Sequence, residues 1–154
     1  MTRLAAGDPA PGFELSADDG TIVSDRTLAG SRYVLYFYPK DVTPGCTTQA
    51  CGLRDSWSRV TRIDAELFGV SPDSVASHAK FREKYALPYR LLADVGHRLA
   101  DAYGVWVQKK VMGLEYMGVE RSTFVIGPDG MIESVLAEVK ADQHVELLME
   151  ALAG

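Results

Sequence analysis

Continuous apolar runs in the chain predict its buried strands. The segment Arg32–Tyr38 contains six consecutive apolar residues, several of them aromatic, and it is too short for a helix of ordinary length. A run of this kind is typical of a strand that is covered on both faces of a sheet. Similar patterns predict strands at Glu66–Ser71, at Leu91-Leu92, where a short strand ends, and at Ser122–Ile126 and Met131–Ala137, which the turn sequence Gly127-Pro128-Asp129-Gly130 joins.

A different spacing predicts a helix after the first of these strands. Apolar residues recur at steps of four, three, four and three, which places them on one helical stripe, at Cys46, Ala50, Leu53, Trp57 and Val60. Thr43 suits the N-cap of this helix, and Pro44 suits its first position, where a missing N–H does no harm. Three more helices are predicted at Pro72–Tyr85, His97–Tyr103 and Ala141–Leu152.

This order of elements indicates the fold class. Strands alternate with helices and are followed by a hairpin and a closing helix, which predicts an α/β layered fold with a central mixed sheet flanked by helices. The 154 residues contain no repeat and no linker, so residues 1–154 are expected to form a single domain. The stretch Val105–Glu120 fits no element clearly; around Trp106–Met112 we expect a folded loop or helix near the functional site.

Composition and charge narrow the function classes. The chain is 47% hydrophobic and 24% charged, as in ordinary globular proteins. Its formal net charge of −5 argues against nucleic acid or an anionic membrane as a partner. The longest apolar run has six residues and the N-terminus has no signal-peptide pattern, so we expect a cytoplasmic protein. In that compartment, two nearby cysteines suggest catalysis, redox chemistry or metal binding before a structural disulfide.

The spacing of Cys46 and Cys51 argues against a static bridge. On an ideal helix, residues five apart lie about 140° apart around the axis and about 7.5 Å along it, so their Cα atoms are about 8.7 Å apart. A disulfide requires less than about 7 Å. The two thiols can therefore pair only if the helix unwinds locally, which suits a redox cycle better than a structural staple.

Cys46 differs from Cys51 in its place on the helix. In the first turn, free N–H groups and the helix dipole stabilise an anion, so a thiolate at Cys46 is favoured. Cys51 lies more than a turn further along and receives less of this stabilisation. The alternative for Cys46 is an ordinary small core residue, because it also lies on the apolar stripe.

Several motifs resemble the peroxiredoxins, and most closely the PrxQ or bacterioferritin comigratory protein type. The signature Pro-x-x-x-Thr-x-x-Cys is present as Pro39, Thr43 and Cys46, and the second cysteine, Cys51, has the spacing of many PrxQ members. Gly7–Leu15 is similar to the family's opening segment, and Arg121–Ile126 is similar to the family's strand that carries the active-site arginine. One departure is Thr48-Gln49, where many members carry Lys-Glu; it alters local electrostatics but removes no catalytic group.

The resemblance implies a thioredoxin-like three-layer fold and a thiol-dependent peroxidase that uses no cofactor and no metal. Cys46 would be the peroxidatic nucleophile that attacks hydrogen peroxide or an organic hydroperoxide and becomes a sulfenic acid. Cys51 would resolve it as a disulfide, and thioredoxin or a similar dithiol would restore both thiols. Thr43 would offer its hydroxyl to the sulfur or the peroxide, Arg121 would hold the thiolate and polarise the peroxide, and Pro39 would shield the sulfur from water. The resemblance also implies a monomer, with a dimer as the alternative.

Each assigned role has a plainer structural alternative. Thr43 could serve only as an N-cap, Pro39 only as a strand terminator, and Arg121 only as the ion-pair partner of Glu120 or Asp129. The three histidines suggest a metal site, but zinc sites usually need a second close ligand pair, which the sequence lacks. We expect His78 instead to edge a packed helix face with Phe81 and Tyr85.

Two other functions compete with peroxide reduction. A thioredoxin-like thiol–disulfide oxidoreductase would favour Cys-x-x-Cys and would not need Thr43. A redox-sensing interaction protein could share the cysteine chemistry without rapid turnover, although the sequence offers no obvious partner-binding tail.

Overall fold

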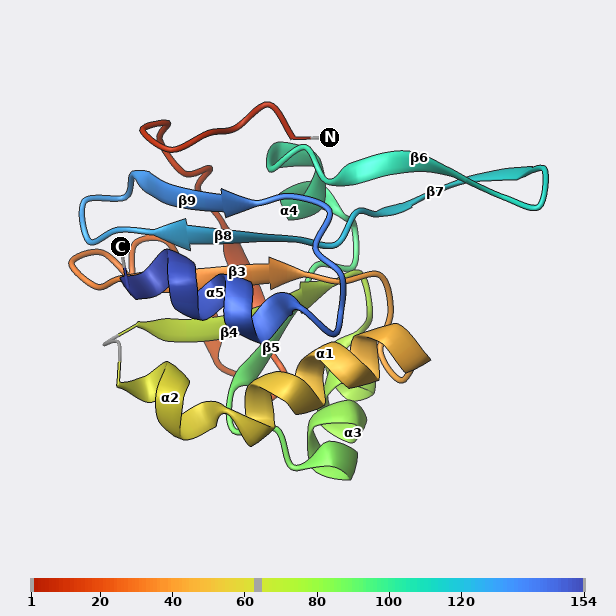
Figure 1. Ribbon diagram of the computed structural model, residues 1–154, viewed down its shortest axis with the longest axis horizontal. Coiled ribbons are helices and arrows are strands. Elements are labelled where there is room, and N and C mark those ends of the chain that lie inside the picture. Colours follow the sequence, from red (N-terminus) through yellow and green to blue (C-terminus); the bar gives the residue numbers. More distant parts are fainter. Residues whose placement is uncertain (1, 63–64, 154) are drawn as a thin grey trace.

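The computed structural model describes residues 2–62 and 65–153, and Figure 1 labels the elements in chain order. The strands are β1 (Glu14–Ala17), β2 (Ile22–Ser24), β3 (Tyr33–Phe37), β4 (Glu66–Ser71), β5 (Arg90–Ala93), β6 (Trp106–Val111), β7 (Leu114–Val119), β8 (Ser122–Ile126) and β9 (Ile132–Leu136). The helices are α1 (Pro44–Asp55), α2 (Trp57–Thr61), α3 (Val75–Tyr85), α4 (Arg98–Ala102) and α5 (His144–Ala153).

The central sheet is mixed, as the sequence predicts. Within the described residues it has seven strands in the order β2-β1-β5-β4-β3-β8-β9. The three strands β3, β4 and β5 run parallel, whereas β1, β2, β8 and β9 pair with their neighbours antiparallel. Strand β3, which is buried along its whole length, lies between β4 and β8 and leads directly into the loop that precedes α1.

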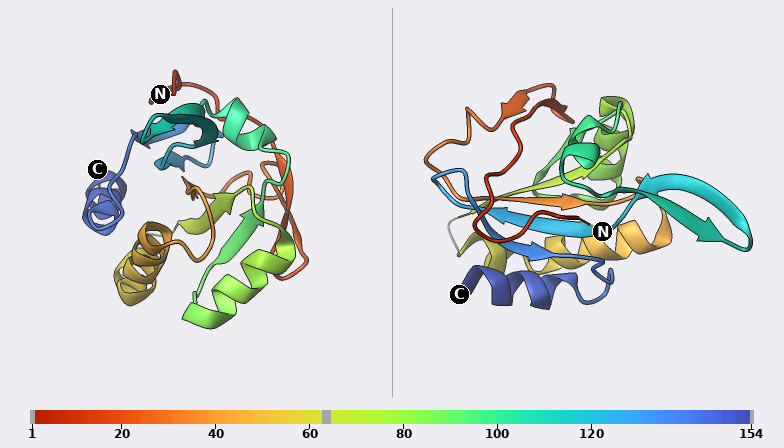
Figure 2. Two further views of the ribbon diagram at one scale, coloured as in Figure 1. Left: turned by 90° about the vertical axis from the view of Figure 1, so that its right-hand side faces the viewer. Right: turned by 90° about the horizontal axis from the view of Figure 1, so that it is seen from above.

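Helices cover both faces of this sheet and create two apolar cores. Along β3, Tyr33, Leu35 and Phe37 point to one core, whereas Val34 and Tyr36 point to the other, as the two-residue repeat of a strand requires. The first core includes residues of α4, and the second includes residues of α1, α3 and α5. Figure 2 shows this arrangement, with α1, α3 and α5 on one side of the sheet and α4 on the other.

The strands predicted from apolar runs are confirmed, and the predicted helices are confirmed with changed ends. Buried strands form at Tyr33–Phe37, Glu66–Ser71 and Ser122–Ile126. The third helix begins at Val75 rather than Pro72, because the Ser74 side chain accepts a hydrogen bond from the Ser77 N–H and caps it there. The C-terminal helix begins at His144, three residues later than expected.

The stripe from Cys46 to Val60 belongs to two helices, not one. The backbone leaves the helical region at Ser56, and the Ser56 N–H closes α1 by bonding to the carbonyl of Gly52 at 3.1 Å. A short second helix, α2, follows and carries Trp57 and Val60. Val60 is still buried and Trp57 still packs on the core, so the apolar spacing is right about the face but not about the continuity of the helix.

Two hairpins were not predicted. The β1–β2 pair adds to the sheet beyond β5, and the unassigned stretch forms the antiparallel β6–β7 hairpin rather than a loop or helix. Figure 1 shows that this second hairpin projects from the body of the molecule. Its apolar side chains are largely exposed, at Val111, Met112, Leu114, Tyr116 and Met117.

In the part of the chain that the structure describes, no helix is long and apolar enough to cross a membrane. That finding agrees with the apolar runs in the sequence, none of which exceeds six residues.

Candidate functional site

The candidate nucleophile lies where β3 ends and α1 begins. Cys46 is the third residue of α1 and is 2% exposed, whereas Cys51 lies in the same helix and is half-buried. Both are free thiols. The prediction that the two cysteines share one helix is confirmed, so the geometric bar to a disulfide in the intact helix also applies.

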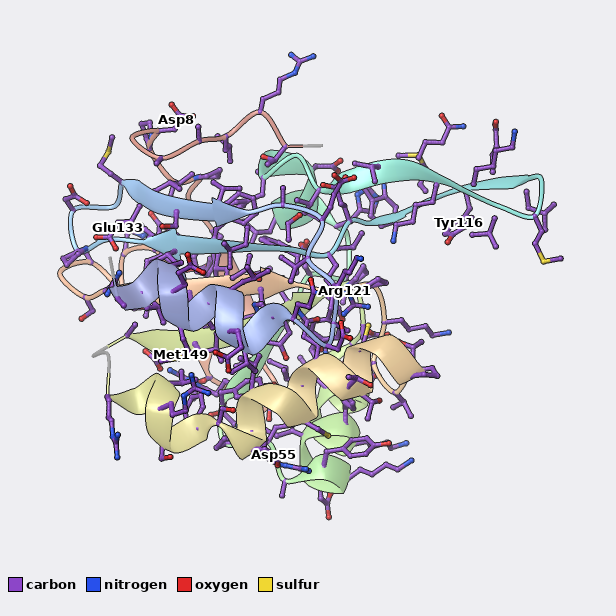
Figure 3. All side chains as sticks on the ribbon, viewed as in Figure 1. Asp8, Asp55, Tyr116, Arg121, Glu133 and Met149 are labelled. Carbon is purple, nitrogen blue, oxygen red and sulfur yellow. The ribbon has the colours of Figure 1, made fainter. Side chains whose placement is uncertain are left out.

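Arg121 reaches this thiol although it lies 75 residues further along the chain. Antiparallel pairing sets Ser122 opposite Phe37, which carries the preceding residue, Arg121, to the end of β3 near α1. Its Nη2 donates to the Sγ of Cys46 at 3.3 Å. Figure 3 labels Arg121 at this end of the sheet, close to the start of α1. The alternative partner Asp129 follows the far end of β8, where its carboxylate accepts from the Met131 N–H at 3.1 Å.

Thr43 occupies the predicted N-cap position but does not cap the helix with its side chain. Its hydroxyl donates to the carbonyl of Lys40 at 2.8 Å, and its own carbonyl accepts from the Thr47 N–H at 2.8 Å. The predicted N-cap position of Thr43 is therefore confirmed, but its hydroxyl turns back to the loop and makes no cap hydrogen bond. Pro39 is half-buried and follows Tyr38 at the end of β3.

A buried polar cluster holds the loop that carries Pro39 and Thr43. The carboxylate of Asp41 accepts from the Tyr38 hydroxyl at 2.6 Å and lies 2.8 Å from the Nδ1 of His78. Burial, followed by the nearby Asp41 charge, raises the pKa of Tyr38 well above its usual value. Asp41 makes two further contacts of 2.8 Å: its carboxylate accepts from the Ser77 hydroxyl, and its N–H donates to the carboxylate of Asp73.

Next in the loop, Val42 has a φ of +65°. This left-handed conformation is unusual for a β-branched residue. It connects Asp41, which the polar cluster holds, to the first turn of α1.

His78 lies on the buried face of α3 with Phe81, as expected, and it is also part of this polar cluster. It is fully buried, and its Nε2 lies 2.9 Å from the carbonyl oxygen of Leu92. The possible metal-ligand atoms of Asp41, Asp73 and His78 lie within 4.8 Å of one another. Each of the three residues also makes hydrogen bonds within the protein.

Three polar residues behind Arg121 were missed as site residues in the sequence. Arg121 Nη1 donates to the Oε1 of Gln49, the Nε2 of Gln49 lies 3.0 Å from the Nδ1 of His144, and the Nε2 of His144 lies 2.8 Å from the hydroxyl oxygen of Thr123. All three are fully buried. One signal existed: Gln49 lies three residues after Cys46, on the buried side of α1.

Electrostatic surroundings complete the site. Burial, followed by the charge of Arg121, lowers the pKa of His144 from 6.5 to about 3, so this imidazole is neutral at physiological pH. On β6, Lys109 is close enough to be influenced by Arg121 and Cys46; burial and then Arg121 lower its pKa. Behind Arg121, the amide of Gln49 and the neutral imidazole of His144 carry no charge.

This arrangement can stabilise negative charge on sulfur and on an atom beside it. A thiolate at Cys46 has the first turn of α1 on one side and a guanidinium on the other. The remaining donors of the guanidinium fork can face an oxygen that becomes negative during the reaction. Such a site suits nucleophilic attack by sulfur.

Comparisons with known proteins agree with this chemistry. The pattern of the AhpC/TSA family matches residues 6–135. The chain is 49% identical over 149 residues to Peroxiredoxin Bcp of Bacillus subtilis (strain 168), covering 97% of this chain and 95% of that protein. It is 40% identical over 152 residues to Peroxiredoxin Bcp of Escherichia coli (strain K12), covering 99% and 97%.

Solved structures of related proteins have a similar fold. A cysteine-to-serine mutant of Xylella fastidiosa PrxQ has a TM-score of 0.91 at 31% identity, covering 99% of this chain and 98% of that one. The Xanthomonas campestris bacterioferritin comigratory protein, whose structures address its alkyl peroxide reduction activity, has a TM-score of 0.86 at 35% identity, covering 92% and 90%.

Proposed function

We propose that Cys46 is the peroxidatic nucleophile of this chain, which belongs to the AhpC/TSA family and is a peroxiredoxin of the Bcp/PrxQ type with a thioredoxin-like fold. Peroxiredoxins are thiol-dependent peroxidases, and the proposal assigns the side chains that carry out this reaction. The observation that carries the assignment is the 3.3 Å contact from Arg121 Nη2 to Cys46 Sγ at the start of α1.

The first step is attack of the Cys46 thiolate on one oxygen of a hydroperoxide. An S–O bond forms, the O–O bond breaks, and the other oxygen leaves with the bonding electrons and takes a proton to become water or an alcohol. Sulfur is oxidised to the sulfenic acid while the peroxide is reduced. Arg121 stabilises the thiolate before the step and the leaving oxygen during it. Thr43 and Pro39, on the clamped loop, orient the peroxide and exclude water from the sulfur.

The second step joins the two cysteines. The Cys51 thiolate attacks the sulfenic sulfur of Cys46, an S–S bond forms, and hydroxide leaves and is protonated to water. Because residues five apart in a helix are too distant for a disulfide, α1 must unwind around these residues first. The contacts that resist unwinding are the Gln49–His144 pair and the Tyr89 hydroxyl, which donates to the carbonyl of Ala50 at 3.2 Å.

The proposed substrates are hydrogen peroxide and organic hydroperoxides. The alkyl peroxide activity of the Xanthomonas campestris relative supports the second group. Thioredoxin or a similar dithiol is the proposed reductant, since the intramolecular disulfide needs a two-electron donor to return to thiols. We propose a monomer in the cytoplasm as the working state, with a dimer as the alternative outcome of a sizing experiment.

A coupled peroxidase assay tests the proposal. We expect wild-type protein to consume hydrogen peroxide and an alkyl hydroperoxide with thioredoxin, and Cys46→Ser to consume neither even with excess reductant. Near wild-type consumption by Cys46→Ser would refute the assignment. A wild-type protein that reduces disulfides but not peroxides would instead indicate a thiol–disulfide oxidoreductase, and a single oxidation without turnover would indicate a redox sensor.

A further inference from the structure

The guanidinium of Arg121 has two partners of very different kind. One arm donates to Cys46 Sγ at 3.3 Å, and the other donates to the side-chain oxygen of Gln49. Gln49 is fully buried and lies three residues after Cys46, so both partners project from the same face of α1. A guanidinium has donors only, and this fixes the orientation of the amide: its oxygen faces Arg121 and its nitrogen faces away.

That amide nitrogen in turn fixes the protonation of His144. Gln49 Nε2 is a donor and lies 3.0 Å from His144 Nδ1, so Nδ1 must be an unprotonated acceptor. The single ring proton is then on Nε2, which donates to the Thr123 hydroxyl at 2.8 Å. The lowered pKa of His144 agrees with this neutral tautomer. The hydrogen bonds therefore run in one direction, from Arg121 to Gln49 and from Gln49 through His144 to Thr123.

We propose that Gln49 and His144 are positioning residues, which hold Arg121 against Cys46 while leaving its positive charge unneutralised. The inference rests on the proposed roles of Cys46 and Arg121. It explains why a fully buried glutamine is bonded to a buried imidazole on another helix, α5: each supplies the one partner that the other lacks. Hydrogen bonds in a buried, fully satisfied chain fix side-chain geometry closely.

The charge argument separates glutamine from glutamate at this position. An amide oxygen orients the guanidinium without cancelling its charge. The full positive charge of Arg121 is then available to stabilise a thiolate at Cys46. A carboxylate would pair with Arg121 and weaken its effect on Cys46. It would also set an acceptor oxygen against His144 Nδ1, itself an acceptor, so that a proton would have to be taken up.

Other ionisable groups of the described residues lie around this hydrogen-bond network. The Tyr36 ring packs on His144 with centroids 5.5 Å apart, and burial raises the pKa of Tyr36 well above its usual value. Lys109 on β6 adds positive charge toward Arg121, and Glu120 attracts Lys109 from the segment between β7 and β8. The sulfur of Cys46 is the group that the geometry sets directly on this arm of the guanidinium.

The test is the pH dependence of Cys46 alkylation by iodoacetamide, measured from pH 5 to 9 in a Cys51→Ser background. Alkylation needs the thiolate but not peroxide, so this readout stays informative if the chain consumes no peroxide, an outcome that would count against the proposed function instead. We expect Gln49→Glu to move the midpoint of the alkylation profile up by about one pH unit or more. We also expect it to slow oxidation of Cys46 by hydrogen peroxide about tenfold at pH 7.

The matched control is Gln143→Glu. Gln143 is exposed and directly precedes His144, so the variant adds the same charge on the surface close to the network. We expect its alkylation midpoint to equal that of the parent. Equal midpoints for Gln49→Glu and the parent, with both proteins folded by circular dichroism, would overturn the proposal.

A second pair of variants covers the case in which Gln49→Glu does not fold. His144→Asn keeps an oxygen that can accept from Gln49, whereas His144→Leu removes it and leaves the amide N–H unpaired. A positioning role predicts that His144→Leu slows Cys46 oxidation and shifts the midpoint, and that His144→Asn restores a large part of both. Loss of stability in His144→Leu with no change in rate or midpoint would show that the network serves only the fold.

Discussion

Lowering the pH from 8 to 5 should destabilise the folded chain through His144. The side chain is fully buried between α1 and β8, and both ring nitrogens have hydrogen-bond partners. Protonation of Nδ1 would break its contact with Gln49. Unfolding releases the imidazole into water, where its ordinary pKa of 6.5 applies. Protons therefore favour the unfolded chain throughout the range between the two pKa values.

The sign and size follow from linkage. The folded pKa is lowered to about 3 and the unfolded one is 6.5. Above pH 6.5 both states hold a neutral imidazole and the stability is fully present; it is lost as the pH falls toward 3. With about 1.4 kcal/mol for each pKa unit, the loss at pH 5 is about 2 kcal/mol, and the whole window is worth roughly 5 kcal/mol.

Urea unfolding of the reduced protein, followed by circular dichroism at pH 8 and pH 5, measures this loss. A change of about 2 kcal/mol corresponds to a fall of about 1 M in the urea midpoint for a domain with a slope near 2 kcal/mol per molar. His144→Asn cannot titrate in this range, so it serves as the control, and other acid-sensitive groups cancel in the comparison. Equal falls in stability for wild type and His144→Asn between pH 8 and pH 5 would refute the reasoning.

Three further predictions address the thiols and the loop. Arg121→Met should slow peroxide consumption about 10²–10³-fold, because one oxyanion donor is lost, and unfolding assays should show a loss of only about 1–3 kcal/mol from the unpaired Gln49 oxygen; full activity, or a protein that no longer folds, would contradict the catalytic role. Cys51→Ser should still form a sulfenic acid at Cys46 once, but turn over poorly with thioredoxin and accumulate sulfinic acid as the peroxide dose rises, which intact-mass spectrometry detects; undiminished turnover would show that Cys51 is not the resolving thiol. Val42→Gly should raise the free energy of unfolding by about 0.5–1 kcal/mol. The left-handed conformation costs a residue with a side chain about 1–2 kcal/mol, but glycine loses more backbone entropy on folding, which offsets part of the gain. A lower melting temperature would show that the valine side chain contributes more stability than the strained conformation costs.

The sequence was informative where burial repeats at a fixed period. The continuous apolar runs at β3, β4 and β8 predict strands because both faces of each strand are covered. The stripe on α1 predicts the buried side of that helix, including Cys46. The hairpins β1–β2 and β6–β7 were missed because neither has a strong period: the second leaves most of its apolar side chains in solvent.

The site was predictable only in part for a related reason. The first-turn position of Cys46 follows from local spacing, whereas the place of Arg121 followed from resemblance alone. The hydrogen bond between Gln49 and His144 joins residues that are 95 positions apart in the sequence, and the Asp41–His78 contact joins residues that are 37 positions apart. Such pairs depend on how helices dock on the sheet, and no local pattern of one sequence encodes that docking.

Peptide mapping by mass spectrometry after one equivalent of hydrogen peroxide tests the central claim most directly. Reduced protein is treated, free thiols are blocked, and the peptides containing Cys46 and Cys51 are examined for a bond between them. We predict that one intramolecular Cys46–Cys51 disulfide forms and that dithiothreitol or reduced thioredoxin removes it. Cys46 that is left as sulfenic acid, or joined to a second chain, with Cys51 still free to be blocked, would contradict the mechanism.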